Sequence, residues 1–194
     1  MANLSNRARA KTISLPPKRL EVVRAPGWSG RGHPELDWLI YGFSTRLGGR
    51  TTVYRQGEEQ GSDLNLGFTD ADDRDVVAAN RGLFVRAVTG GKDFLGLVTL
   101  RQIHSSLIRK VRAEDVQGNE MPALLKGDGL MTDEPGVLLG IQTADCIPVL
   151  LADRKNRAVA AFHAGWRGTL ARIVENGVGR MRLEFGSRPE PLMA

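Results

Sequence analysis

The sequence predicts an α+β fold in which mixed β-sheets are flanked by helices. Short apolar runs rich in β-branched and aromatic residues recur between turn signals, which is typical of strands. Two other segments place apolar residues at helical spacing instead. With 194 residues, the chain is long enough to bury a hydrophobic core as one domain.

The N-terminal segment is basic, and we expect residues 1–30 to be a flexible arm and residues 31–194 to be the single folded domain. The arm begins without hydrophobic periodicity and contains two adjacent prolines. Residues 36–43 are predicted as a strand because they combine aromatic and β-favouring residues. The following turn, residues 44–49, ends in two glycines, which adopt backbone conformations closed to other residues.

The remaining elements follow from the same signals. A helix is predicted over residues 76–88, with Asp72 and Asp73 near its start favouring the helix dipole and Gly90-Gly91 ending it. A second helix follows the motif H-A-G-W-R-G and carries Leu170, Ile173, Val174, Val178 and Met181 on one face. The predicted strands are residues 95–104, residues 105–111 as their continuation or neighbour, and residues 137–141, 147–152 and 158–162; residues 113–128 are expected to be irregular.

The net charge of +5 is concentrated near the N-terminus. Residues 1–31 carry seven basic side chains and one acidic one, so the rest of the chain has a net charge of −1. We therefore expect no nucleic-acid partner, because binding requires a basic face on the folded part. No apolar stretch approaches the ~18 residues of a membrane span, and no hydrophobic region follows the basic start as a secretory signal would require. A single cysteine fits the reducing cytoplasm, and we expect a monomer or weak homo-oligomer.

The lone cysteine, Cys146, and two of the three histidines, His104 and His163, each stand at the end of an apolar run. Strands would deliver these side chains to the rim of a sheet, which predicts one metal centre although the three residues are separated by 42 and 17 positions. One thiolate and two imidazoles are a ligand set that Zn²⁺ accepts. Three protein ligands leave a fourth position for water, as in catalytic zinc sites.

Two other chemistries remain open for these atoms. Cys146 and His163 can form the thiolate–imidazolium pair of a cysteine hydrolase, with Asp145 or a backbone group orienting the ring. A ligand set of two histidines and one cysteine also occurs in blue-copper sites, but no methionine follows Cys146 or His163 at short range. A multicopper cluster is excluded, since three histidines cannot ligate several copper ions.

Several further residues are candidates for substrate contacts. Arg46 precedes a double glycine, so its guanidinium and nearby amides can hold a phosphate, or it can neutralise a surface carboxylate. Arg167 stands at the start of the last helix, where free N–H groups favour anions. Asp145 is a candidate general acid or base, and Asp128 is a similar candidate; a structural turn carboxylate is the alternative for each.

Several motifs together resemble one known family. They are Q-I-H (residues 102–104), G-D-G-L-M-T (127–132), T-A-D-C-I-P-V-L-L (143–151) and H-A-G-W-R-G-T (163–169), supported by S-T-R-L-G-G, L-N-L-G and the D-D…N-R of residues 72–81. Over roughly residues 36–185 the chain resembles the YfiH or laccase-domain family, formerly called multicopper polyphenol oxidases.

The resemblance implies a YfiH-like fold, related to CNF-type cysteine hydrolases, and a zinc-dependent purine nucleoside enzyme. Members phosphorolyse adenosine, inosine and methylthioadenosine to the base and ribose 1-phosphate, and they deaminate adenosine. A copper-dependent polyphenol oxidase activity is also attributed to the family. The family's zinc ligands match His104, Cys146 and His163. The family's arginine of T-R-x-G-G matches Arg46, and our own hypothesis is that Gln102, Arg46 and Arg167 bind substrate or phosphate. Members continue past the last helix with further elements, so we expect this chain to lack the final segment of the fold.

Overall fold

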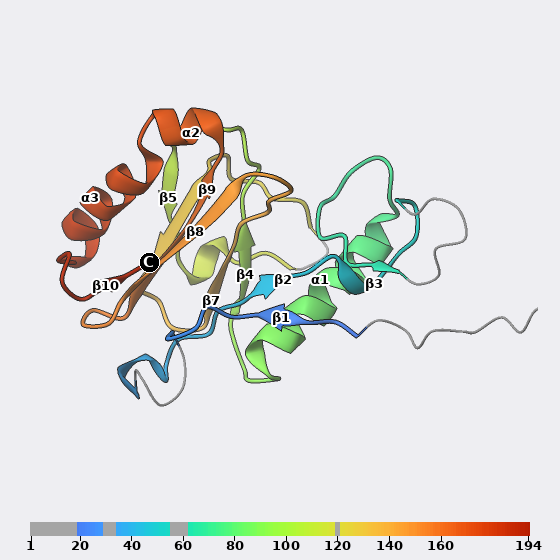
Figure 1. Ribbon diagram of the computed structural model, residues 1–194, viewed down its shortest axis with the longest axis horizontal. Helices are drawn as coiled ribbons and strands as arrows, with labels where there is room; N and C mark the ends of the chain where they lie inside the picture. Colours follow the sequence, from blue (N-terminus) through green and yellow to red (C-terminus); the bar gives the residue numbers. More distant parts are fainter. Residues whose placement is uncertain (1–18, 29–33, 55–61, 119–120) are drawn as a thin grey trace, which may run out of the picture.

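A five-stranded mixed sheet forms the centre of the protein (Figure 1). The computed structural model describes residues 19–28, 34–54, 62–118 and 121–194. The strand order is β10-β8-β9-β6-β5, with β5 and β6 parallel and the other pairs antiparallel. The strands are β5 (Ile108–Lys110), β6 (Gly129–Thr132), β8 (Ile147–Asp153), β9 (Ala158–Ala164) and β10 (Leu192–Met193).

The hairpin of β8 and β9 confirms two predicted strands. Its turn is fixed by Asp153, whose carboxylate accepts hydrogen bonds from the backbone N–H groups of Lys155 and Asn156 at 2.9 and 3.0 Å. Such side-chain to backbone bonds are the reason that aspartate favours turns. The resulting register places Pro148 opposite His163. The start of β8 and the end of β9 therefore lie side by side.

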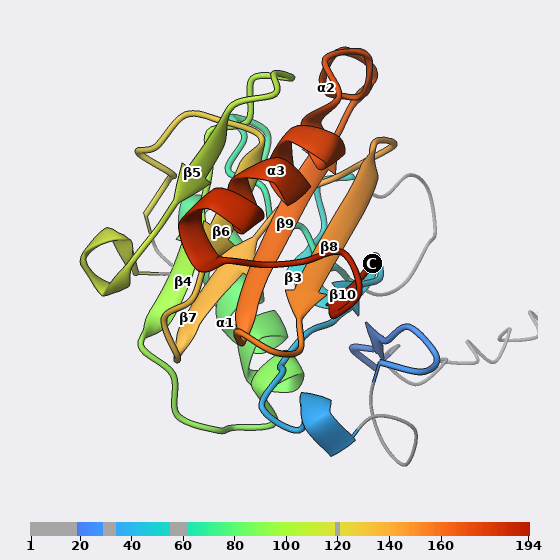
Figure 2. The ribbon, with the colours of Figure 1, turned by 90° about the vertical axis from the view of Figure 1, so that its left-hand side faces the viewer.

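Helix α3 (Ile173–Phe185) covers one face of this sheet (Figure 2). Its residues Ile173 and Met181 are fully buried in the same cluster as Phe162 of β9. Gly177, one turn from each of them, packs directly on the Phe162 ring, where an added Cβ would collide with the aromatic carbons. A glycine at this position therefore sets how closely the helix approaches the sheet.

The single C-terminal helix that we predicted is divided in the structure. A short helix α2 (Trp166–Leu170) precedes α3, and Arg172 between them adopts a left-handed conformation with φ of 57°. A left-handed residue cannot continue a right-handed helix, so the axis changes direction there.

The opposite face of the sheet packs against a second layer, the parallel pair of β4 (Gly96–Thr99) and β7 (Val137–Gly140). Successive residues of a strand point to opposite faces. Leu130 of β6 accordingly joins Val98 and Val137 in this second core, whereas its neighbour Met131 packs on the α3 side. Of the strand predicted over residues 95–104, only residues 96–99 form β4.

Helix α1 (Arg74–Thr89) confirms the first predicted helix. Asp73 caps its N-terminus by accepting hydrogen bonds from the backbone N–H groups of Asp75 and Val76, and Gly90 ends it in a left-handed conformation with φ of 62°. Its buried Asn80 accepts from the backbone N–H of Arg50 at 2.7 Å and so attaches the helix to β3 (Leu47–Thr51).

Two expectations for the N-terminal region are wrong. Residues 36–43 do not form one strand: a 3₁₀ turn η1 (Pro34–Leu36) is followed by irregular chain and the short β2 (Phe43–Ser44). Residues 19–28, assigned to the arm, belong to the folded body. There β1 (Val22–Val23) pairs with β2, and Trp28 is 8% exposed, packed on Tyr41 at a ring distance of 5.2 Å. Although the segment is polar in composition, the burial of these apolar side chains stabilises its contact with the folded body. Residues 1–18 lie outside the described part.

The segment predicted as irregular contains one 3₁₀ turn, η2 (Ala113–Asp115), and is followed directly by β6, a strand that the sequence did not predict. Mixed sheets flanked by helices, as predicted, describe the whole arrangement. Across the described ranges, the helices are all too short or too polar to cross a membrane.

Candidate metal centre

His104, Cys146 and His163 meet at one end of the β8–β9 hairpin. Their possible ligand atoms all lie within 4.8 Å of one another. Cys146 immediately precedes β8 and His163 is the penultimate residue of β9, so the hairpin register brings them together. His104 arrives from the loop between β4 and β5, and its ring meets the ring of His163 edge-on at a centroid distance of 4.8 Å. The structure thus brings together the three residues singled out in the sequence, although His104 lies in a loop and not at the end of a strand as expected.

The three side chains differ in exposure. His163 is buried, Cys146 is half-buried and His104 is exposed. The centre is therefore rigid on the side of the sheet and open on the side of His104. This arrangement leaves room for a further ligand or a substrate.

Asp128, the residue immediately before β6, holds the centre in place. Its Oδ1 accepts from the His104 backbone N–H at 3.0 Å and lies 2.9 Å from His163 Nδ1. Its Oδ2 accepts from the backbone N–H of Ile103 at 3.3 Å and from both the N–H and the hydroxyl of Ser105 at 2.7 Å. This one fully buried carboxylate therefore orients a ring from β9 and the loop that carries His104.

These contacts also fix the charge of Asp128. Burial by itself raises the pKa of this carboxyl group, but the hydrogen bonds from Ser105, His163 and the loop amides outweigh it and hold the pKa below the ordinary value. The group is ionised at neutral pH, and a carboxylate can only accept hydrogen bonds. The Nδ1 atom of His163 therefore carries a proton, and its Nε2 lone pair is free to bind a metal.

Because Gly165 has no side chain, the three candidate ligands can approach one another next to it. A Cβ at this position would lie 3.0 Å from Cδ2 of His104, 3.3 Å from Sγ of Cys146 and 3.4 Å from Cε1 of His163. A side chain at position 165 would therefore enter the space between the three candidate ligands.

These residues fit a metal ion. Tetrahedral coordination with bonds of about 2.0–2.3 Å places ligand atoms roughly 3.3–3.8 Å apart. The observed limit of 4.8 Å is wider by about 1 Å, which small side-chain rotations close. A carboxylate bound to the second nitrogen of a histidine ligand, as Asp128 is to His163, is the usual support for such a site.

The environment of Cys146 does not match that of a nucleophilic cysteine. Desolvation, a hydrogen bond to Asp145 at 3.6 Å and the negative charges of Asp145 and Asp128 all raise the pKa of the thiol. Reactive cysteines have a lowered pKa, produced by positive neighbours. The ring of His163 is oriented by Asp128 and not by Asp145, as one alternative supposed. Surrounding carboxylates favour a cation at this position instead.

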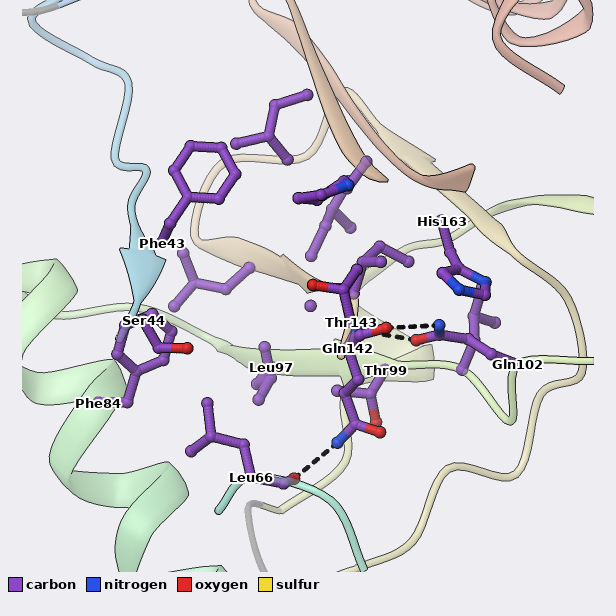
Figure 3. A pocket seen from close by; sticks show the side chains of 18 of the residues that line it. Phe43, Ser44, Leu66, Phe84, Leu97, Thr99, Gln102, Gln142, Thr143 and His163 are labelled. Carbon is purple, nitrogen blue, oxygen red and sulfur yellow. Dashed lines mark hydrogen bonds between the residues drawn. The ribbon is translucent and has the colours of Figure 1, made fainter. Parts of the chain in front are cut away.

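A cavity of about 910 Å³ adjoins the centre. Figure 3 shows His163 and Gln102 on one side of it and Phe43, Ser44 and Phe84 across from them. Its walls come from β2, α1, β4, β7, β8 and the loops between them, and most of them are apolar. Such a volume and composition are typical of small-molecule sites.

One wall of the cavity is held by a pair of glutamines. The side chain of Gln102 donates to the backbone carbonyl of Gln142 at 2.7 Å and accepts from its N–H at 2.8 Å (Figure 3). The side chain of Gln142 in turn donates to the carbonyl of Leu66 at 2.6 Å. Gln102 therefore lines the cavity as predicted and at the same time positions the loop that leads to Cys146.

Of the other three residues predicted to act on the substrate, one lines the cavity and two do not. Asp145 lines the cavity beside Cys146. Arg46 and Arg167 do not line it. The Nε of Arg46 is 3.6 Å from Asp63, with the arginine side chain 63% exposed, and the guanidinium of Arg167 stands 5.1 Å from the ring of the exposed Trp166.

Sequence reasoning did not single out the roles of Asp128 and Gly165. Both stand in motifs of small residues, G-D-G-L-M-T and H-A-G-W-R-G, that interrupt apolar strands. An acidic residue between two glycines at the start of a buried strand is the signal that points to such a support.

Comparisons with known proteins found similar sequences of named enzymes. The family model described as multi-copper polyphenol oxidoreductase laccase matches residues 40–194. A purine nucleoside phosphorylase of Deinococcus radiodurans is 36% identical over 172 residues, covering 89% of this chain and 60% of that protein. Adenosine deaminase RL5, from an unknown prokaryotic organism, is 42% identical over 96 residues, covering 47% of this chain and 36% of that protein.

Solved structures show the same likeness. The crystal structure of YlmD from Geobacillus stearothermophilus matches with a TM-score of 0.70 and 30% identity, covering 91% of this chain and 63% of that one. This chain therefore spans less than two thirds of the Deinococcus and Geobacillus proteins.

Proposed function

Because the chain belongs to the multi-copper polyphenol oxidoreductase laccase family, we propose that it is a zinc-dependent enzyme of purine nucleosides. The reactions are phosphorolysis of adenosine, inosine or methylthioadenosine to the base and ribose 1-phosphate, and deamination of adenosine. Relatives named as purine nucleoside phosphorylases and one named as an adenosine deaminase support both reactions. The observation that carries the proposal is the trio of His104, Cys146 and His163 beside a cavity large enough for a nucleoside.

The donor set favours zinc. One thiolate and two imidazoles suit this ion, and three protein ligands leave a position for catalysis. A zinc ion, when bound, supplies Lewis-acid catalysis at this end of the cavity. His104, Cys146 and His163 hold it, and Asp128 keeps the His163 ring in the orientation that presents Nε2.

A copper cluster does not suit these residues. The described part of the chain contains one group of three potential ligands, and it includes two histidines. Sites with several copper ions are built mainly on imidazole. The residues that the structure describes therefore offer one site for a single metal ion.

We assign the proton transfer of deamination to Asp145. This carboxylate lines the cavity next to Cys146, is exposed, and is free of the structural bonds that occupy Asp128. Departing ammonia needs a proton, and a carboxyl group at the edge of the site can take one from water and pass it on. Gln102 is proposed to contact the substrate, since it lines the cavity beside the ligand loop. The phosphate roles of Arg46 and Arg167 stay predictions.

The direct test incubates the protein with adenosine, with and without phosphate and with and without a chelator, and separates the products by chromatography. We expect inosine without phosphate, base plus ribose 1-phosphate with it, and neither after chelation. Cys146→Ala and His104→Ala should lose both bound zinc and turnover. Full turnover by metal-free Cys146→Ala would falsify the proposal. Activity blocked by alkylation but insensitive to chelation would favour a cysteine hydrolase, and oxygen consumption with phenols would favour an oxidase.

A further inference from the structure

Arg81, in the middle of α1, carries a buried positive charge. The residue is 6% exposed, its guanidinium stacks 4.3 Å from the ring of Phe68, and its Nε donates to the carbonyl of Leu66 at 2.8 Å. Burial lowers the pKa of Arg81 to about 10, so the side chain remains charged at neutral pH. The helix therefore holds a fixed cation inside the protein.

This cation has no carboxylate partner within the described ranges. Its two terminal nitrogens make neither a hydrogen bond nor an ion pair with any residue that the structure describes. Buried charges are costly and are normally paired, so an unpaired guanidinium points to a ligand. A carbonyl and an aromatic face compensate only part of the desolvation cost.

Arg81 lines the same cavity as the metal centre. The carbonyl of Leu66 accepts from both Arg81 and Gln142, and the backbone N–H of Gln142 donates to Gln102, two positions before His104. One hydrogen-bonded wall thus connects the guanidinium to the loop that carries a candidate ligand. A molecule in the cavity is exposed to both the metal centre and this cation.

The charges in the cavity favour an anion. Its described lining contains two guanidinium groups, the buried one of Arg81 and the exposed one of Arg101, against one carboxylate, Asp145. A guanidinium presents paired N–H donors that match two oxygens of a phosphate. A nucleoside itself carries no anionic group, so a second reactant must supply it.

We propose that Arg81 binds the phosphate group in phosphorolysis, either as incoming inorganic phosphate or as the ester of the sugar product. This inference rests on the proposed function. In the reaction, an oxygen of HPO₄²⁻ forms a bond to the anomeric carbon as the bond from that carbon to the purine nitrogen breaks. The electron pair of the broken bond stays on the purine, and the phosphate proton ends on the released base. Arg81 positions the attacking group and donates to the oxygens that do not react.

The test compares Arg81→Gln with Arg74→Gln. Arg74 is the matched control, because it stands on the same helix and faces the same Phe68 ring at 5.6 Å, but is exposed and does not line the cavity. Binding of inorganic phosphate and of ribose 1-phosphate is measured by calorimetric titration of each zinc-loaded protein. We expect Arg81→Gln to weaken phosphate binding by about tenfold or more and Arg74→Gln to leave it unchanged. The two titrants distinguish a site for free phosphate from one that also takes the ester.

Kinetics separate a phosphate contact from a structural effect. Arg81→Gln should raise the KM for phosphate in phosphorolysis by a similar factor and leave the KM for adenosine in deamination unchanged. Equal losses in both reactions, or phosphate affinity equal to that of the unaltered protein, would overturn the inference. If the glutamine variant does not fold, Arg81→Lys retains the charge without the paired donors and should show the same selective loss, to a smaller extent.

The titration also separates this inference from the proposed function. If the unaltered protein turns over no nucleoside but binds phosphate through Arg81, the anion site stands and the enzyme proposal fails. If both reactions occur and phosphate binding instead depends on Arg46 or Arg101, the enzyme proposal stands and Arg81 is excluded.

Discussion

Replacing Asp128 by asparagine is the sharpest test of how the metal centre is held. The change preserves the shape of the side chain but removes the charge and turns one oxygen into an N–H donor. If the amide nitrogen replaces Oδ1, it faces the His104 N–H and the protonated Nδ1 of His163. If it replaces Oδ2, it faces the N–H groups of Ile103 and Ser105, whereas the Ser105 hydroxyl can turn and accept from it. Either orientation therefore loses two hydrogen bonds.

The size of the effect follows from this count. Hydrogen bonds to a charged group each contribute roughly 1.5–3 kcal/mol, so Asp128→Asn should lower the free energy of unfolding by about 3–6 kcal/mol. Domains of this size are stable by about 5–15 kcal/mol, so the variant should be weakened but able to fold. Loss of the carboxylate behind a histidine ligand typically reduces metal affinity about 10–100-fold.

Two measurements check this prediction. Urea denaturation gives the change in the free energy of unfolding, and competition with a chromophoric chelator gives the zinc affinity. Asp133→Asn serves as the control, because this exposed aspartate follows β6 as Asp128 precedes it. If Asp128→Asn matched this control in both measurements, the buried carboxylate would not orient the centre and our reasoning would be wrong.

Three further predictions concern other parts of the molecule. Gly165→Ala should weaken zinc binding in the same competition assay with little loss of far-ultraviolet circular dichroism, because its methyl group enters the space between the three ligands; unchanged affinity would contradict the assignment of that space. Gly177→Ala should lower the free energy of unfolding, measured in urea, by about 1–3 kcal/mol, because the methyl group meets the fully buried Phe162 ring. Gly179→Ala, in open space on the same helix, should raise it by about 0.5–1 kcal/mol. Burial raises the pKa of Asp72, but hydrogen bonds from Asn65, Thr51 and the backbone lower it below 3.8, so its contribution to stability is present at neutral pH and is lost as the pH falls through that lowered pKa. Asp72→Asn should therefore flatten the acid limb of unfolding free energy against pH, and an unchanged limb would refute this.

The sequence alone determined the elements whose signals are local. Helix α1 followed from apolar spacing, from acidic residues near its start and from the glycines after its end, all within or next to its own residues. The strands β8 and β9 followed from two apolar runs, whereas their pairing as a hairpin was not predicted. Cys146, His104 and His163 were identified by residue type and by their positions at the ends of apolar runs, which the sequence shows directly. The expected strand end is wrong for His104, which lies in the loop after β4.

The tertiary structure decided which elements meet. β5 pairs in parallel with β6 and β4 with β7, and no local pattern specifies either partner. The helix break at Arg172 and the docking of residues 19–28 likewise depend on packing against distant segments. Pairing and burial are decided by contacts between segments far apart in the chain, whereas periodicity and capping act over a few residues.

The same distinction applies to the site. The three candidate ligands could be named from the sequence, but the support given by Asp128 arises from contacts 23 to 35 positions away. The buried cation of Arg81 became visible only when its lack of a carboxylate partner and its place in the cavity wall were known. Whether a buried charged side chain has a partner within the protein depends on its neighbours in three dimensions. Those neighbours come from distant parts of the chain, so local sequence patterns do not predict them.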